Sequence, residues 1–344
     1  KVELHVHLDG AIRSDTIFDI AQRRKIQIPA KTKEELRQQL QMKEANLDTL
    51  LEYFRTFMPV VAGSREAVYQ LAYEFCEDCA KHKIKYVEAR YSPHLLANSC
   101  EKPFYSLERG SFTPREVVTT VNEAFEKGSQ DFNVDVKSIL CCIRTNSEFS
   151  MEVAQLCRDF RSDGVVAIDI AGPEFILGND KGNSPHKLAY MDAYQNGIHR
   201  TAHAGEVTPP GSVLEAIDDL HAERIGHGYT CLKDESLYQR IKKERIHLET
   251  CPISSMMTGL ALAHTKINHP ISKFANDEVN FSLNTDDPLV LGNNISEDYK
   301  VAMEMGLSRD QITQSIFNAA RSSFTSDKEK ASLIKELIRV YGQY

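Results

Sequence analysis

The sequence of 344 residues contains no tryptophan, and no apolar stretch approaches the roughly 20 residues that a membrane-spanning helix needs. It also has no long basic run, and its formal net charge is −8. These absences argue against membrane insertion and against nucleic acid as a partner. The first residues, Lys1-Val2-Glu3-Leu4, lack the pattern of a signal peptide. We therefore expect a cytoplasmic protein.

Cysteine is also scarce, since eight residues are too few for a disulfide-dense scaffold. Cys141 and Cys142 are adjacent in an apolar run, where buried thiols are common. Cys76 and Cys79 form a C-x-x-C pair, but its context is helical and no second pair completes a zinc ribbon. We interpret this pair as helix-packing residues in a protein of a reducing compartment.

The residues that are present have the pattern of an α/β protein. Apolar residues make up 42% and charged residues 26%, as in ordinary globular proteins. Eight short apolar runs alternate with amphipathic segments, which predicts a (β/α)8 TIM barrel formed by one domain over residues 1–344. The predicted strands are 1–8, 84–92, 136–144, 165–172, 197–205, 224–229, 245–252 and 279–287.

The barrel pattern is extended by extra helices after the first strand and at the C-terminus. They are predicted at 14–25, 33–42, 46–58, 308–320 and 327–341. The long connection after the first strand belongs to the end of a barrel where active sites open, so it could form a lid. A further helix has start signals at Thr113 and Pro114 and is expected to end at Gly128.

Several polar residues lie at the predicted carboxyl ends of strands, which meet at the catalytic end of a barrel. They are His5, His7, Asp169, Gly172, His203, Glu206, His227, Asp286 and Asp287. The H-x-H spacing places the first two side chains on one face of a strand. Such positions bring residues from distant parts of the sequence together.

Three histidines and an aspartate are the ligand set of a catalytic zinc site. His5, His7 and His203 with one aspartate would supply four ligands, although H-x-H alone is a weak motif and His203 alone could be a core histidine. The predicted strand 165–172 carries no lysine of the kind that bridges two metals in many amidohydrolase barrels. The pattern therefore favours a single metal ion.

The other polar residues each have a functional and a structural interpretation. Glu206 could relay protons, or it could be a solvated residue that opens the next helix. His227, between two glycines, could orient or deprotonate a water, or it could only fill the barrel mouth. One of the adjacent Asp286 and Asp287 could reach the metal and the other the substrate, because neighbours on a strand alternate in direction. Alternatively, one of them belongs to a turn before Pro288.

At this point the sequence resembles the adenosine deaminase family, from residue 1 to about residue 340. The resemblance is to the vertebrate cytosolic type. The matching segments are "KVELHVHLDGAI", "YVEARYSPHLLANS", "SILCCIR", "NGIHRTAHAGEV", "ERIGHGYT", "ETCPISS" and "SLNTDDPL". The resemblance implies a zinc enzyme that hydrolyses adenosine and 2′-deoxyadenosine to inosine and deoxyinosine, with release of ammonia.

The resemblance also implies a role for individual residues. The single zinc ion would be held by His5, His7, His203 and Asp286. Glu206 would protonate N1 of the purine and shuttle protons, and His227 would support the attacking hydroxide. Asp287 would bind N7 and help to position the attacking water.

The remaining implied contacts concern substrate binding. The Gly172 backbone N–H would bind N3 of the purine, and Asp9, with His7 nearby, would bind the ribose 5′-hydroxyl. Lid residues would be Leu47, Leu50 and Phe54, although their spacing of i, i+3 and i+7 also fits the core stripe of a helix.

Two positions depart from the family pattern. Leu50 stands where an aromatic residue is expected, and no tryptophan follows Cys251-Pro252. We expect the altered lid to change substrate affinity and inhibitor preference and not the reaction.

Two alternatives remain open from the sequence. The first is another zinc hydrolase on the same barrel, which would deaminate adenine, AMP or N6-methyl-AMP. The second is a non-catalytic docking or signalling protein, because some family members bind a cell-surface peptidase, which would add a cell-surface location. That second alternative predicts an incomplete site, whereas every expected polar residue is present in the sequence.

Overall fold

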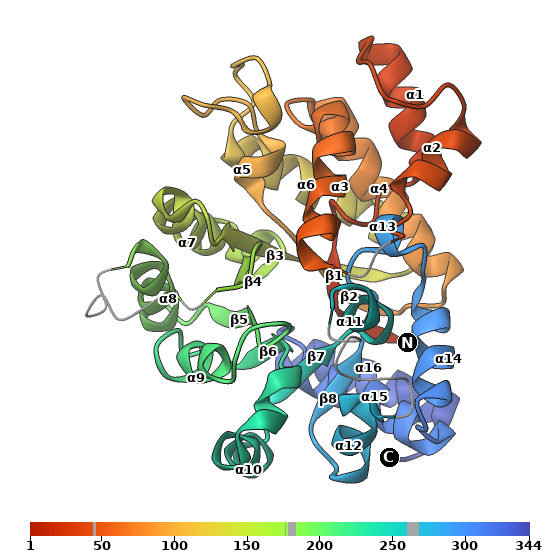
Figure 1. The fold of residues 1–344 in the computed structure, drawn as a ribbon, viewed down its shortest axis with the longest axis vertical. Coiled ribbons are helices and arrows are strands. Elements are labelled where there is room, and N and C mark those ends of the chain that lie inside the picture. Colours follow the sequence, from red (N-terminus) through yellow and green to blue (C-terminus); the bar gives the residue numbers. More distant parts are fainter. Residues whose placement is uncertain (44–45, 176, 178–183, 260–267) are drawn as a thin grey trace.

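Eight parallel strands form the centre of the molecule in the computed structural model, and helices surround them (Figure 1). The structure describes all residues except 44–45, 176, 178–183 and 260–267. The strands follow one another in chain order around the sheet, each hydrogen-bonded to the next. They are β1 (Val2–His7), β2 (Tyr86–Tyr91), β3 (Asp135–Ile143), β4 (Val165–Ala171), β5 (His199–Ala204), β6 (Arg224–His227), β7 (His247–Thr250) and β8 (Phe281–Leu283).

The sheet closes between its first and last strands. The His7 backbone N–H donates to the Asp286 carbonyl at 2.8 Å, and the Asp286 N–H donates to the His5 carbonyl at 3.1 Å. These bonds confirm the predicted (β/α)8 barrel. The predicted strand 279–287 was too long, because the chain leaves strand geometry after Leu283 and reaches a left-handed conformation at Asp286, with φ 67°.

The helices include all five of the predicted additions to the barrel. After β1 come α1 (Ser14–Arg24), α2 (Lys33–Leu40) and α3 (Leu47–Val61), and α15 (Arg309–Ser322) and α16 (Asp327–Tyr341) end the chain. The others are α4 (Arg65–Lys81), α5 (Pro93–Leu96), α6 (Pro114–Phe132), α7 (Ser150–Asp159), α8 (Pro185–Gln195), α9 (Gly211–Asp218), α10 (Glu235–Glu244), α11 (Pro252–Met257), α12 (Pro270–Asn276), α13 (Pro288–Leu291) and α14 (Ile295–Glu304). Within the described ranges, no helix has the length and apolar character that crossing a membrane requires.

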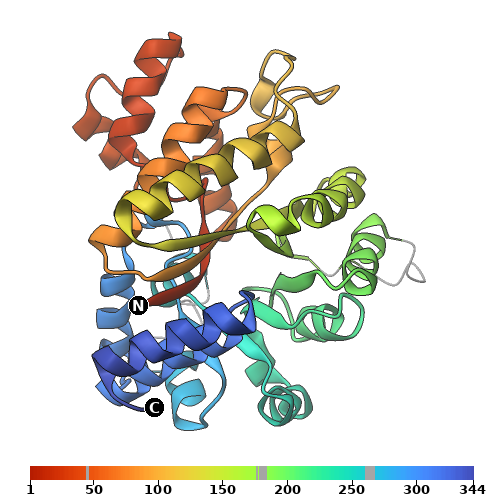
Figure 2. The same cartoon turned by 180° about the vertical axis from the view of Figure 1, so that it is seen from behind.

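The two ends of the barrel are covered differently. Val2 and Leu4, near the start of β1, pack in a buried cluster with Ile316 and Phe317 of α15. Seen from behind, α15 and α16 lie across this end (Figure 2). The carboxyl ends of the strands therefore form the end at which a site can open.

Gly128 does not end a helix, contrary to the prediction. Thr113 and Glu116 form a capping box at the start of α6, as the start signals suggested, but α6 continues to Phe132. Gly128 is buried, and a Cβ placed on it would lie 2.6 Å from the Cβ of Cys76 in α4. The glycine therefore permits a close approach of two helices. Cys76 is itself buried and free, as is Cys79, in agreement with their predicted packing role.

We expect Gly128→Ala to destabilise the protein by about 1–3 kcal/mol, because the added methyl group overpacks the contact with Cys76. Alanine is the better helix former by about 1 kcal/mol, so the steric cost has to exceed that gain. Chemical denaturation measures the difference. Gln130→Ala, at an exposed position of the same helix, is the control for helix propensity. A Gly128→Ala protein as stable as the unsubstituted chain would contradict the packing argument.

Candidate active site

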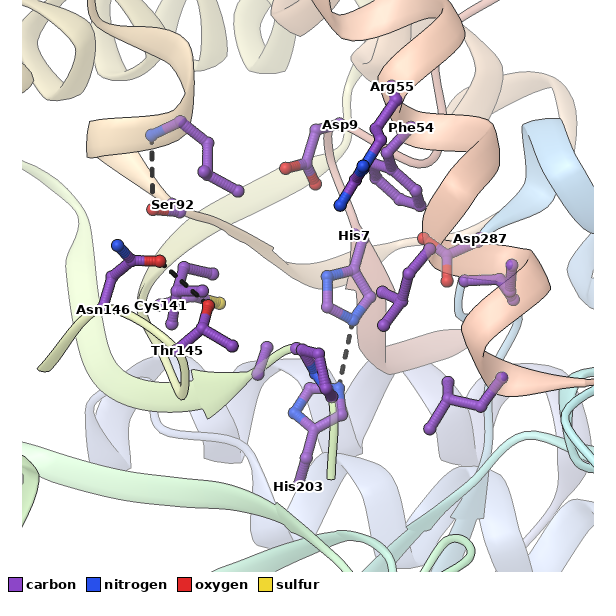
Figure 3. Close-up of a pocket in the computed structure, with 18 of the residues that line it drawn as sticks. His7, Asp9, Phe54, Arg55, Ser92, Cys141, Thr145, Asn146, His203 and Asp287 are labelled. Carbon is purple, nitrogen blue, oxygen red and sulfur yellow. Dashed lines mark hydrogen bonds between the residues drawn. The ribbon is translucent and has the colours of Figure 1, made fainter. Parts of the chain in front are cut away.

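A cavity of about 640 Å³ opens at the carboxyl ends of the strands. Figure 3 shows His7 and His203 at its floor, with Asp9, Phe54 and Asp287 around it. The predicted site residues that line it are His7, Asp9, Leu47, Leu50, Phe54, Gly172, His203, Glu206, His227, Asp286 and Asp287. The barrel topology thus brings together residues that are far apart in the sequence.

Three of these side chains, together with the buried His5, meet at one point. The Nε2 atoms of His7 and His203 are 3.1 Å apart. Oδ1 of Asp286 lies 3.2 Å from Nε2 of His5 and 3.3 Å from Nε2 of His7. The four residues each offer one ligand atom within 4.8 Å of the others. This is the predicted ligand set of three imidazoles and one carboxylate.

Carboxylates on the far side of two imidazoles, those of His5 and His203, orient these rings toward this point. Nδ1 of His5 lies 2.8 Å from Oε2 of Glu249, and Nδ1 of His203 lies 3.0 Å from Oδ2 of Asp169. Nε2 of His5 is buried and forms no hydrogen bond of good geometry among the described residues, although Oδ1 of Asp286 lies 3.2 Å away. Burial lowers the pKa of His203 to about 4, so its ring is neutral at pH 7, as a metal ligand must be. The donor set and its backing fit a bound metal ion.

The backbone around the centre is unusual for two of these residues. His227 and Asp286 adopt left-handed conformations, with φ of 68° and 67°. Such conformations cost about 1–3 kcal/mol each in side-chain-bearing residues and tend to occur at functional sites. Gly226 provides space for a neighbour, because a Cβ there would lie 2.8 Å from Cε1 of His5. This explains one of the two glycines that flank His227.

Glu206 is buried, with 4% of its surface exposed, and α9 begins only at Gly211. The structure therefore excludes the interpretation of Glu206 as a solvated helix start. Its Oε2 lies 3.5 Å from Nε2 of His227. Burial, together with the charge of Asp286, raises the pKa of Glu206 well above its ordinary value. A carboxyl group whose pKa is raised in this way keeps its proton to a higher pH than a surface glutamate does, and it can act as a general acid.

Two further aspartates carry buried oxygens that accept no hydrogen bond. They are Oδ1 of Asp9 and Oδ1 of Asp287, and both residues line the cavity. Burial raises the pKa of both carboxyl groups, and the neighbouring Asp286 adds to the effect at Asp287. A buried acceptor without a partner costs free energy until a donor reaches it. Both carboxyl groups are therefore suited to polar groups of a ligand, since each can accept a hydrogen bond and, when protonated, can also donate one.

The three predicted lid residues lie on helix α3. Leu47, Leu50 and Phe54 all line the cavity. Leu50 is only 3% exposed and belongs to the main buried cluster. The same helical stripe therefore covers the cavity and packs in the core. Ile253 stands directly after Cys251-Pro252, where a tryptophan is expected. It is not among the described residues that line the cavity.

Some residues that support the site are not predicted from the sequence. The strand pattern does not single out Glu249, and it places Asp169 at a strand end without assigning it a role. Ser254 donates a hydrogen bond to Oδ2 of Asp286 at 2.6 Å. Glu174 accepts from the backbone N–H of Glu206 at 3.2 Å and so holds the turn after β5. Glu249 and Asp169 had a usable signal, since each is a charge inside an apolar strand, whereas Ser254 and Glu174 had none.

Comparison with known proteins gives a consistent result. The family model of adenosine deaminase matches residues 1–340. The chain is 47% identical to adenosine deaminase of Bos taurus over 99% of this chain and 94% of the relative, and 46% identical to that of Xenopus laevis over 99% and 96%.

Among solved structures, adenine deaminase from Arthrobacter aurescens superposes with a TM-score of 0.84 at 26% identity, covering 99% of both chains. The Arabidopsis N6-mAMP deaminase superposes with a TM-score of 0.80 at 24% identity, covering 98% of this chain and 97% of that one, which shows the shared fold. The family match and the curated relatives each span nearly the whole chain. This protein is therefore a member of the adenosine deaminase family.

Proposed function

We propose that the protein hydrolyses adenosine and 2′-deoxyadenosine to inosine and deoxyinosine, releasing ammonia, and that one zinc ion is its cofactor. The observation that carries the proposal is the convergence of His5, His7, His203 and Asp286 beside the buried Glu206. The curated relatives named adenosine deaminase support the choice of substrate. Residues 1–344 are proposed to act as one domain, since the barrel uses strands from both ends of the chain.

A zinc ion held by the four ligands would act as a Lewis acid that makes a water nucleophilic near neutral pH. His227 lies beside this centre, with Nε2 3.9 Å from Oδ2 of Asp286. Burial lowers the pKa of His227 well below its ordinary value, so the ring is neutral. A neutral imidazole can accept a hydrogen bond from the attacking water and orient it.

Glu206 is proposed to move the protons. In its protonated form it donates to N1 of the purine, which makes C6 electrophilic. As its carboxylate, it takes a proton from the attacking water and delivers it to the departing amino group. The C6–O bond forms and the C6–N bond breaks, so ammonia leaves. As the C6 hydroxyl becomes a carbonyl, its proton returns to Glu206, so one water is consumed and the protonated Glu206 is regenerated.

Substrate contacts are proposed for the buried carboxyl groups and the lid. Asp287, protonated because burial raises its pKa, would donate to N7 of the purine and help to position the attacking water, and the Gly172 backbone N–H would donate to N3. Asp9 would accept from the ribose 5′-hydroxyl, with His7 nearby. The apolar side chains of α3 would cover the nucleoside and exclude water.

The substrate is tested directly with the purified protein. We expect adenosine and deoxyadenosine to be turned over, with loss of the adenine chromophore, and adenine, AMP and N6-methyl-AMP to react far more slowly. The Arthrobacter relative makes adenine the strongest competing substrate. Faster turnover of adenine than of adenosine would replace this proposal, and no turnover of any purine would favour the non-catalytic alternative.

Asp9→Asn is expected to raise the KM for adenosine by about 10–100-fold, because a hydrogen bond to a charged group contributes about 1.5–3 kcal/mol. It should also relax the discrimination against AMP, since a carboxylate repels a phosphate. Steady-state kinetics with both substrates measures the two effects. If Asp9→Asn left the adenosine to AMP ratio unchanged, Asp9 would not face the 5′ position.

Three other expectations stay predictions that rest on family resemblance and sequence pattern. They are a cytoplasmic location, docking to a cell-surface peptidase with a cell-surface fraction, and the effect of the altered lid at Leu50 on affinity. Nucleic acid and membrane insertion are not proposed as interactions.

A further inference from the structure

Arg90 lies in the middle of the barrel, below the candidate metal centre, and its side chain is fully buried. It projects from β2 and contacts three other strands. Nη1 donates to Oδ2 of Asp169 at 2.9 Å, and Nη2 donates to Oε2 of Glu249 at 2.6 Å and to the Leu4 carbonyl at 2.7 Å. These partners belong to β4, β7 and β1.

The same two carboxylate oxygens hold the imidazoles of the metal centre. Oε2 of Glu249 accepts from Arg90 and also lies 2.8 Å from Nδ1 of His5. Oδ2 of Asp169 accepts from Arg90 and lies 3.0 Å from Nδ1 of His203. A continuous chain of contacts therefore runs from His5 through Arg90 to His203.

The chemistry of arginine suits this position. A guanidinium group is planar, and its N–H groups point in fixed directions, so two carboxylates bound to one fork have a fixed separation and orientation. Without the guanidinium group, Oδ2 of Asp169 and Oε2 of Glu249 would lose the donor that links them, and the two carboxylates would rotate or change their hydrogen bonds. Each such movement would turn an imidazole away from the centre.

We propose that Arg90 is a positioning residue that fixes the relative orientation of His5 and His203 through Asp169 and Glu249, and thereby sets the affinity of the centre for its metal ion. The inference rests on the proposed function only in that the four ligands bind a metal. It does not depend on which purine is the substrate.

Arg224 provides a matched control in the same interior. It is also fully buried, and Nε donates to the other oxygen of Glu249, Oε1, at 2.7 Å. Its further contacts are an ion pair with Glu88 at 2.6 Å and a hydrogen bond to the Ser322 carbonyl at 3.0 Å. None of these contacts is to Asp169, the carboxylate that holds His203, so Arg224 should serve the fold more than the metal centre.

The test compares Arg90→Lys with Arg224→Lys and does not use enzyme activity. Zinc affinity of the metal-free proteins is measured by competition with a chromogenic chelator, and their thermal unfolding is recorded. We expect Arg90→Lys to weaken zinc binding by about 10–100-fold, the range typical of groups that orient metal ligands. Arg224→Lys should lower the melting temperature of the metal-free protein but change zinc affinity by less than about threefold, because Arg224 contacts Glu249 through the oxygen that does not contact His5 and has no contact with Asp169.

A spectroscopic readout separates positioning from general loss of stability. Cobalt(II) bound in place of zinc should show a changed visible spectrum in Arg90→Lys and an unchanged one in Arg224→Lys. Equal zinc affinities in Arg90→Lys and the unsubstituted chain would overturn the proposal, as would equal weakening in both variants. If Arg90→Lys does not fold, Glu249→Gln takes its place. It should weaken zinc binding by at least about tenfold, and unchanged affinity would refute the proposed route through Glu249.

Discussion

Glu206→Gln is expected to lower kcat for adenosine by about 100- to 10,000-fold while the protein keeps its metal, because the amide cannot donate and accept the protons that the reaction requires. The substitution keeps the size of the side chain and its place beside His227, so the fold and the cavity should persist. Steady-state kinetics and metal analysis of the same preparation measure the two quantities.

The physical reason lies in the surroundings of Glu206. Its carboxyl group is buried beside Asp286 and Glu174, and burial and these charges keep it protonated at a pH where a surface glutamate is ionised. Glu244→Gln, at an exposed position of α10, is the control and should leave the rate unchanged. A Glu206→Gln protein with near-normal turnover would exclude Glu206 as the proton carrier, whereas loss of metal in this variant would show that the residue acts on the centre.

The sequence predicted the arrangement of the site well because strand ends impose few choices. His5, His7, His203 and Asp286 each follow or end an apolar strand run, and a closed barrel leaves one place for such residues to meet. Their convergence required only the correct number and order of strands. Small errors in strand bounds did not matter, as β8 illustrates, since Asp286 reaches the centre after the strand has ended.

The supporting residues were harder to predict because their roles depend on three-dimensional neighbours. Arg90 and Glu249 each read as a charge within a strand run, and nothing local reveals that they bind one another across the barrel. At Gly128 the local pattern is misleading. A glycine at this point of the sequence favours a helix end, but the structure uses it to let Cys76 of the neighbouring helix approach closely. Pairings across the core are therefore the part of the structure that local pattern reasoning cannot supply.

Removal of the metal is expected to lower adenosine turnover below about 1% of the starting rate, because without a Lewis acid the attacking water stays neutral and weakly nucleophilic. Dialysis against a chelator followed by addition of one equivalent of zinc should restore the rate. The metal should also stabilise the fold by about 2.7 kcal/mol when it is present at 100 times its Kd, because it binds only the folded ligand set. Metal analysis, kinetics and thermal unfolding of the same samples test the three statements.

Two histidines on β5 provide the matched variants for this prediction. His203 faces the centre, whereas His199 is 45% exposed and pairs with Glu223 on the outside of the barrel. His203→Ala should bind less than one equivalent of zinc and lose most turnover, and His199→Ala should retain both. An unchanged rate after chelation would show that the reaction does not need the metal. A full equivalent of metal in both variants would show that His203 is dispensable for binding, so the four convergent side chains would not be the site of the catalytic ion.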